Sequence, residues 1–248
     1  MKKVNEEITL TEKLKKGLMQ ILLTKGIGHT KFKMTEIGEM PEEWVIAKVS
    51  DIYNIVTGTT PSTSVKEYWQ QGKIEWVTPK DLRYVGPSLY IFSSERKITE
   101  KAIAENSLTL IPQYSIIIST RAPVGYVGIN IKEATINQGC KGLIPKEPTI
   151  LDTRFHANFF SSISEYMNNI SGGSTFKELA KDAMGNIGIP VPNILEQRKI
   201  ADILYRINNK LELLRNKKTY LERIKKGLMN DLFTGRVRVK EEASKGEN

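Results

Sequence analysis

The chain has 248 residues, 40% of them hydrophobic, which is ample for one medium-sized domain with a real core. Its single cysteine, Cys140, excludes an internal disulfide, and no segment approaches the roughly 20 apolar residues that span a bilayer. Residues 1–10 hold two lysines and two glutamates with no apolar segment after them. We therefore expect a cytoplasmic protein without a signal peptide or a membrane partner.

The net charge of +9 is unevenly distributed along the chain. Residues 1–34 hold 8 Lys and Arg against 3 Asp and Glu, and residues 198–240 hold 13 against 4. Residues 35–197 hold 15 against 18, and residues 241–248 hold 1 against 3. Two basic segments therefore flank a slightly acidic one. This balance indicates either an anionic partner such as nucleic acid or a solvated helix face that keeps the protein soluble.

The first predicted element is a helix within residues 1–34. Thr9 with Glu12 forms a possible capping box at its start. The segment supplies an apolar stripe of Leu14, Leu18, Ile21 and Leu22. This stripe can pack on a long helix of its own chain or of a second chain.

Residues 35–190 are predicted to form one globular domain of mixed short strands and helices. Runs rich in β-branched residues predict strands at 73–77, 115–119 and 124–131. Residues 152–170 are typical of a helix, and Thr175 with Glu178 forms a second capping box for a short helix that ends near Gly185. The order of elements predicts an α+β fold.

A long helix is predicted from Asn193 to Thr234, within a segment that we bound at 191–236, followed by a flexible tail at 237–248. Asn193 is the expected N-cap, and Gly235 follows the helix. A coiled-coil seam with spacings of mostly three and four is formed by Ile200, Leu204, Ile207, Leu211, Leu214, Leu221, Ile224, Leu228 and Leu232. At 1.5 Å per residue the rod is about 60 Å long. We therefore expect part of it to meet a partner helix and to mediate dimerisation.

The same short helix occurs twice in the chain. Glu12–Thr24 reads EKLKKGLMQILLT and Glu222–Thr234 reads ERIKKGLMNDLFT, so eight of the thirteen aligned residues are identical at an offset of 210. A period this long is not that of a solenoid. It indicates one globular unit bracketed by two copies of a helix end, and a function that depends on pairing with another copy. The alternative is that both ends simply dock on the core.

Several motifs follow one another in a fixed order. They are IGEMPEEW (37–44), TGTTPS (57–62), YWQQGKIEWVTPKDL (68–82), STRAPVGYVG (119–128), TINQGCKGLIP (135–145), GGSTFKEL (172–179) and IGIPVPNILEQRKIADIL (187–204). Together they resemble the specificity subunit of type I restriction-modification systems, over nearly the whole chain. In that family a full-length subunit has two target recognition domains, separated by two conserved helices that pair as an antiparallel coiled coil.

The resemblance implies a half-length form with a single target recognition domain. We expect it to bind double-stranded DNA and to pair through its long helix with itself or with a second half-subunit; a truncated fragment is the other possibility. A homodimer would read inverted half-sites. The resemblance also implies a methyltransferase subunit that uses S-adenosylmethionine and an ATP-driven restriction subunit as partners. We expect no cofactor and no catalytic residue on this chain, with S-adenosylmethionine, ATP and Mg²⁺ on the partner subunits.

Candidate DNA contacts are polar residues in the loops between predicted strands. Arg and Lys suit guanine, and Asn and Gln suit adenine. The candidates are Thr60, Ser62, Thr78, Lys80, Arg83, Arg121, Asn137, Gln138, Lys141 and Ser174. Arg121 and Gln138 are the strongest, because each lies in a family motif beside glycines that let the backbone approach DNA.

Two other functions fit parts of the sequence. Asp81 with Glu95 and Lys97 has the spacing of a D…ExK nuclease, in which two carboxylates hold Mg²⁺, provided that Asp81 and Glu95 lie on adjoining strands. A dimerising adaptor without DNA contact is the second alternative. His29 and His156 have no ligand at metal spacing, and the sequence lacks a Walker A pattern, an NPPY-type methyltransferase tetrad and a Gly-rich nucleotide loop.

Overall fold

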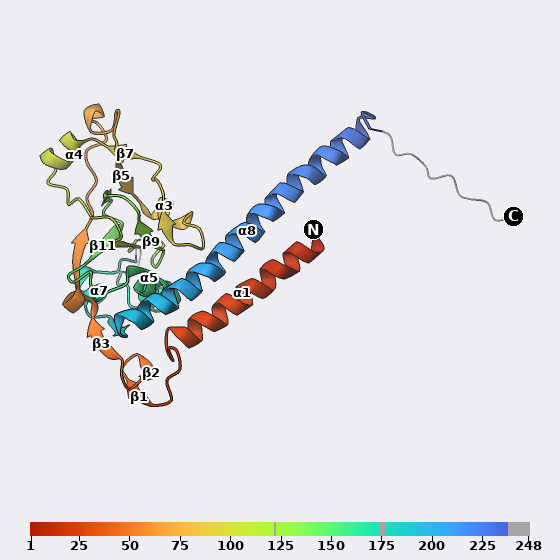
Figure 1. The fold of residues 1–248 in the computed structure, drawn as a ribbon. Coiled ribbons are helices and arrows are strands. Elements are labelled where there is room, and N and C mark those ends of the chain that lie inside the picture. The colour runs from red at the N-terminus through yellow and green to blue at the C-terminus, as the bar shows by residue number, and fades with distance from the viewer. Residues whose placement is uncertain (122, 174–176, 238–248) are drawn as a thin grey trace.

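The computed structural model describes residues 1–121, 123–173 and 177–237. Two helices project side by side from a globular domain (Figure 1). The helices are α1 (Lys2–Leu22), α2 (Val49–Ile52), η1 (Lys66–Tyr68, a 3-10 helix), α3 (Pro79–Arg83), α4 (Glu100–Glu105), α5 (Thr153–Ser162), α6 (Ser164–Asn169), α7 (Lys181–Gly185) and α8 (Ile194–Phe233). The predicted α+β class, with a long C-terminal helix and a shorter N-terminal one, is confirmed.

Two sheets form the centre of the domain. The strands are β1 (Phe32–Thr35), β2 (Gly38–Pro41), β3 (Val45–Lys48), β4 (Tyr53–Thr57), β5 (Ile74–Val77), β6 (Tyr90–Ile91), β7 (Lys97–Ile98), β8 (Ile116–Ser119), β9 (Val127–Asn130), β10 (Ala134–Ile136), β11 (Cys140–Pro145) and β12 (Gly188–Val191). A five-stranded sheet has the order β4-β11-β8-β9-β6, and a three-stranded sheet has the order β10-β5-β7. β11 is antiparallel to β4 and β8, whereas β5 and β10 run parallel.

The isoleucines of β8 divide the core into two layers. Successive side chains of a strand point to opposite faces of the sheet. Ile116 and Ile118 accordingly pack with Phe155 of α5 on one face, and Ile117 packs with Ile136 on the other, toward the three-stranded sheet. The five-stranded sheet therefore lies between helices α5 and α8 on one side and the smaller sheet on the other.

The polypeptide chain enters and leaves the globular domain at the same place. β12, which precedes α8, pairs with β3 in antiparallel register, with Ile189 opposite Ala47. The two ends of the domain thus lie together, and α1 runs toward this point while α8 runs away from it (Figure 1). α1 and α8 consequently pack as an antiparallel pair.

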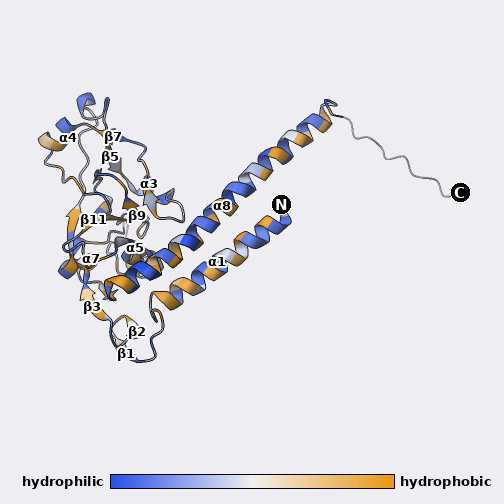
Figure 2. Ribbon diagram, in the orientation of Figure 1, coloured by the Kyte–Doolittle hydropathy of each residue, from blue (hydrophilic) through white to orange (hydrophobic). Residues whose placement is uncertain are grey.

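The long helix has the ends that the sequence predicts. The Asn193 side chain accepts a hydrogen bond from the Glu196 N–H at 3.0 Å, and Gly235 adopts a φ of +70° after the last turn. α8 has 40 residues, so it is about 60 Å long. Apolar residues recur along it to its far end, beyond the start of α1 (Figure 2). None of the described helices is long and apolar enough to cross a membrane.

Three local predictions are corrected. α1 begins at Lys2, so Thr9 is not a cap; it lies inside the helix and donates to the Asn5 carbonyl at 3.1 Å. The predicted helix 152–170 is two helices, α5 and α6, interrupted at Ile163. Thr175 lies outside the described residues, and Glu178 forms a β-bridge, so the following helix, α7, begins only at Lys181.

Candidate nucleic-acid interface

The ends of five strands meet at one edge of the domain, which we name the loop edge. Parallel β5 and β10 both end there, so Thr78 and Asn137 follow neighbouring strands. In the larger sheet Cys140, the first residue of β11, is opposite Ser119, the last of β8, and Lys141 is opposite Thr57, the last of β4. The loop edge therefore comprises the segments 58–64, 78–83, 120–121, 123–124 and 137–139.

Backbone hydrogen bonds join these loops into one surface. Thr59 N–H donates to the Ile136 carbonyl at 3.0 Å, and Thr120 N–H donates to the Gly139 carbonyl at 2.8 Å. A Cβ atom at Gly58 would lie 2.1 Å from the Asn137 carbonyl oxygen. The glycine of the TGTTPS motif is therefore required by the close approach of two backbones.

Two tryptophans hold the backbone of the 58–64 loop. Trp69 Nε1–H donates to the Ser62 carbonyl at 3.1 Å, and Trp76 Nε1–H donates to the Thr59 carbonyl at 3.2 Å. The guanidinium of Arg96 lies 3.5 Å from the centre of the Trp69 ring, a cation–π arrangement. Both tryptophans lie in the YWQQGKIEWV motif, but residue type and spacing alone do not predict this cluster.

Several predicted DNA contacts lie together at the loop edge. Thr60 Oγ1 donates to Gln138 Oε1, so the amide nitrogen of the exposed Gln138 side chain is turned to other partners. Asn137 Oδ1 accepts from Gly139 N–H at 3.0 Å. The hydroxyl groups of Ser62 and Ser64 are 2.7 Å apart. These side chains belong to two facing loops and are half-buried or exposed.

Arg121 and Lys141 share one carboxylate. Arg121 Nη2 lies 2.9 Å from Glu178 Oε2, and Lys141 Nζ lies 3.9 Å from Glu178 Oε1. Arg121 is exposed, but the Lys141 side chain is only 3% exposed, and burial lowers the pKa of its amine. The prediction for Lys141 is therefore corrected: it lies under Arg121 and Glu178 and does not reach the surface. Glu178 was not among the residues predicted for this site.

The remaining candidates lie on α3 or outside the described residues. Thr78 caps α3 through its contacts with Asp81, and Lys80 Nζ pairs with Glu95 Oε2 at 2.6 Å. Arg83, with Lys15 and Arg215, lines a groove between the domain and the α1–α8 pair. Ser174 lies outside the described residues.

The nuclease hypothesis fails its own geometric requirement. Asp81 lies on α3, and its carboxylate accepts hydrogen bonds from the N–H groups of Thr78 and Glu95, each at 2.8 Å. Glu95 lies in the loop before β7, and Lys97 pairs with Glu75 at 2.9 Å. The two carboxylates are not on adjoining strands. In the described part of the chain no group of three His, Cys, Asp or Glu residues is placed to hold a metal ion.

His156 and Cys140 are buried and have structural roles. His156 is fully buried between Tyr53, whose hydroxyl lies 2.8 Å from Nδ1, and the Pro190 carbonyl, 3.0 Å from Nε2. Cys140 is fully buried, which raises the pKa of its thiol. Neither arrangement is that of an activated nucleophile or base.

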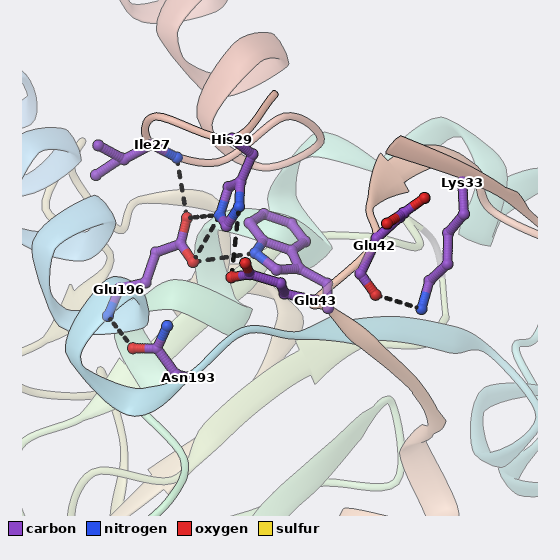
Figure 3. Close-up of polar contacts among 8 residues, drawn as sticks. Ile27, His29, Lys33, Glu42, Glu43, Asn193 and Glu196 are labelled. Carbon is purple, nitrogen blue, oxygen red and sulfur yellow. Dashed lines mark hydrogen bonds and ion pairs between the residues drawn. The ribbon is translucent and has the colours of Figure 1, made fainter. Parts of the chain in front are cut away.

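Glu196, at the first turn of α8, connects the helices to the domain (Figure 3). Its carboxylate accepts from Ile27 N–H at 2.9 Å and from Trp44 Nε1–H at 3.0 Å, and it lies 2.9 Å from His29 Nε2. A Cβ atom at Gly26, where φ is +65°, would lie 2.4 Å from Glu196 Oε1. The contacts hold the loop after α1 and the residue before β3 in one orientation relative to α8.

The predicted dimerisation residues of α8 fall into three groups. Buried within the chain are Ile200, Leu204, Leu211 and Leu214. Half-buried are Ile207 and Leu221. Exposed are Ile224 (40%), Leu228 (57%) and Leu232 (47%). The dimerisation role is corrected for Ile200 and Leu204, because both pack in the core of the domain. Leu211 and Leu214 lie on the part of α8 that α1 covers, and their role stays a prediction. The seam also passes through buried Asn208 rather than Ile207.

Comparison with known proteins points to one family. The family model for the type I restriction modification DNA specificity domain matches residues 41–223. The MjaIX specificity subunit of Methanocaldococcus jannaschii is 39% identical, over 86% of this chain and 49% of the relative. The EcoR124I/EcoR124II specificity subunit of Escherichia coli is 33% identical, over 59% of this chain and 36% of the relative.

Solved structures share the fold. The HsdS subunit from Thermoanaerobacter tengcongensis matches with a TM-score of 0.62 and 16% identity, over 95% of this chain and 54% of that one. The S subunit from M. genitalium matches with a TM-score of 0.54 and 17% identity, over 77% of this chain and 46% of that one. The chain spans about half the length of the Methanocaldococcus relatives that it matches.

Proposed function

Because this chain belongs to the family of type I restriction modification DNA specificity domains, we propose that it is the DNA-reading half of a specificity subunit. The family resemblance predicted from the sequence is thereby confirmed. The observation that carries the functional proposal is the loop edge. It gathers Thr60, Arg121, Asn137 and Gln138, whose side chains are of the types that contact DNA bases, on loops held by backbone hydrogen bonds.

The proposal assigns the two projecting helices to spacing and assembly. A pair of chains joined through α8 would carry one loop edge at each end of a rod about 60 Å long. DNA has about 34–36 Å per helical turn, so the half-sites would lie about one to two turns apart. The target would be an inverted repeat for a homodimer and asymmetric for a pair of different half-subunits.

The chemistry of modification and cleavage is assigned to partner subunits. Among the polar and titratable groups described above, none is arranged as a nucleophile with its base. We propose a methyltransferase subunit that uses S-adenosylmethionine and an ATP-driven restriction subunit as partners, with DNA closed between them.

The test is to co-express the chain with its methyltransferase subunit in a methylation-free host and to map modified adenines across the genome. A two-part motif with an unread spacer is expected, and its symmetry distinguishes a homodimer from a mixed pair. If a soluble, assembled complex methylates nothing, the DNA-reading proposal is wrong, and an adaptor or an inactive fragment becomes the better interpretation.

Arg121 and Glu178 should affect DNA binding in opposite directions. We expect Arg121→Ala to weaken binding of the assembled complex about tenfold, because a base or phosphate contact of arginine is lost. Glu178→Gln should tighten binding, since it removes a negative charge that holds Arg121 and repels phosphate. Fluorescence anisotropy with a labelled duplex measures both.

The matched control is Lys132→Ala. Lys132 is exposed like Arg121, but it lies in the turn after β9, at the opposite end of the sheet from the loop edge. Its removal should change affinity less than twofold if the loop edge is the DNA surface. Equal losses for the Arg121 and Lys132 variants would contradict this placement.

A further inference from the structure

The first copy of the repeated helix occupies a defined surface. In α1, the residues that face α8 recur at spacings of four and three: Val4, Thr11 and Leu22 are buried, and Ile8, Lys15 and Leu18 are half-buried. Burial and the nearby Arg215 lower the pKa of Lys15. α1 thus lies on α8 through one continuous a/d face.

The second copy presents the same face, which is buried at Leu214, half-buried at Lys218 and Leu221, and exposed beyond them. At the offset of 210, the residues equivalent to those of α1 are Leu214, Lys218, Leu221, Lys225, Leu228 and Leu232. Three of these positions are identical in the two copies: Lys15 and Lys225, Leu18 and Leu228, and Leu22 and Leu232. Leu221 replaces the polar Thr11 and Leu214 replaces Val4, whereas Lys218 replaces Ile8. Leu228 and Leu232 are exposed, because α8 continues past the start of α1 (Figure 1).

One ion pair marks the register of α1 on α8. Arg215 Nη2 lies 2.8 Å from Glu12 Oε1. Glu222 is the counterpart of Glu12 in the repeat and makes a 4.0 Å contact with Lys218 of its own helix. An antiparallel second chain in the same register would place its Glu222 beside Arg215, and its Arg215 beside Glu222 of the first chain.

That register is symmetric. Its two-fold axis passes midway between positions 215 and 222, between Lys218 and Thr219. Thr234 of one copy would then lie opposite Ile203 of the other, so the pairing would also cover Ile224, Leu228 and Leu232. A closed two-fold interface of this kind contacts the same surface on both chains.

We propose that residues 222–234 of a second copy take the place of α1 on α8, so that α1 acts as an internal competitor of dimerisation. The proposal rests on the dimeric function proposed above and specifies how the dimer forms. The tethered α1 has the advantage of a high effective concentration. The second copy has the advantage of a longer apolar seam. The balance makes dimerisation depend on the concentration of the chain.

Charge reversals in the full chain test the exchange by sedimentation velocity across a concentration series. Glu12→Arg places like charges at the α1–α8 contact alone and should tighten the dimer roughly tenfold. Glu222→Arg places them at the intermolecular contact and should weaken it by a similar factor. The double variant Arg215→Glu, Glu222→Arg restores an attractive pair between the two chains. Within each chain, the new carboxylate at position 215 repels Glu12 and weakens the hold of α1. The double variant should therefore dimerise at least as tightly as the native chain.

Cross-linking locates the axis independently. Because Cys140 is buried, a cysteine introduced at position 218 is the reactive one. Lys218→Cys should give a covalent dimer under mild oxidation. Leu14→Cys, on the exposed outer face of α1, should not, and circular dichroism checks that both variants keep their helices.

The outcomes separate the two proposals. If Glu12→Arg leaves the dimer unchanged or weaker, or if Leu14→Cys cross-links in place of Lys218→Cys, α1 stays on α8 and the exchange is wrong, while the dimeric function stands. If every variant, including Glu12→Arg, is monomeric at all concentrations, the dimeric function itself fails, and the exchange with it.

Discussion

Replacing Glu196 by alanine is expected to lower the free energy of unfolding by about 3–5 kcal/mol, the range for removing one partner from a buried charged network. The carboxylate is 8% exposed and receives Ile27 N–H, Trp44 Nε1–H and the His29 ring. In the variant these groups would be left without their acceptor, and leaving buried donors unpaired is costly. Urea denaturation followed by tryptophan fluorescence measures the loss.

Two further variants test whether the loss of stability comes from the Glu196 carboxylate. Glu43→Ala removes the other carboxylate near His29, 3.7 Å from Nδ1, but that side chain is 78% exposed. Its removal should cost less than about 1 kcal/mol. Glu196→Gln should remain strongly destabilising, because its NH2 group would face the N–H of Ile27 or of Trp44 whichever way the amide lies. Equal effects of Glu196→Ala and Glu43→Ala would refute a central role for this carboxylate.

The domain is expected to lose stability as the pH falls from about 6.5 to 4, because His156 stays neutral in the fold. Burial lowers the pKa of His156 from 6.5 to about 4, an effect that the hydrogen bond to the Pro190 carbonyl opposes. That carbonyl must accept, so Nε2 carries the proton and Nδ1 accepts from the Tyr53 hydroxyl. In this pH window the unfolded chain binds a proton that the folded chain does not.

The size and the sign of this change in unfolding free energy follow from the linkage between proton binding and folding. Stability should be complete above pH 6.5 and decline by up to about 1.4 kcal/mol per pH unit toward pH 4, roughly 3 kcal/mol in all. His156→Gln supplies an amide that can donate to Pro190 and accept from Tyr53 but does not titrate. Urea midpoints of both proteins between pH 7.5 and 4.5 isolate the histidine contribution from that of the carboxylates. Parallel curves would contradict the assignment.

The candidate site could be predicted only as a set of loops. Arg121, Gln138 and Thr60 were identified by residue type and motif, and the strands between them bring them to one edge. Lys141 is basic like Arg121 and lies in the same motif as Gln138, but its position in β11 places it beneath Glu178. Which face of a short strand is covered depends on segments distant in the sequence, so residue type alone could not distinguish Lys141 from Arg121.

The sequence by itself determined the helical repeat, the extent of α8, its Asn193 cap, the α+β class and the family, because each depends on local periodicity, capping chemistry or ordered motifs. Only the tertiary structure decided which side chains those helices bury. Leu14 and Ile21 of the predicted stripe are exposed, whereas Val4 and Thr11 lie against α8. Periodicity defines an apolar face to within a turn, but the partner selects the face that is covered. Here the partner is α8, nearly the whole chain away in sequence and adjacent in the fold.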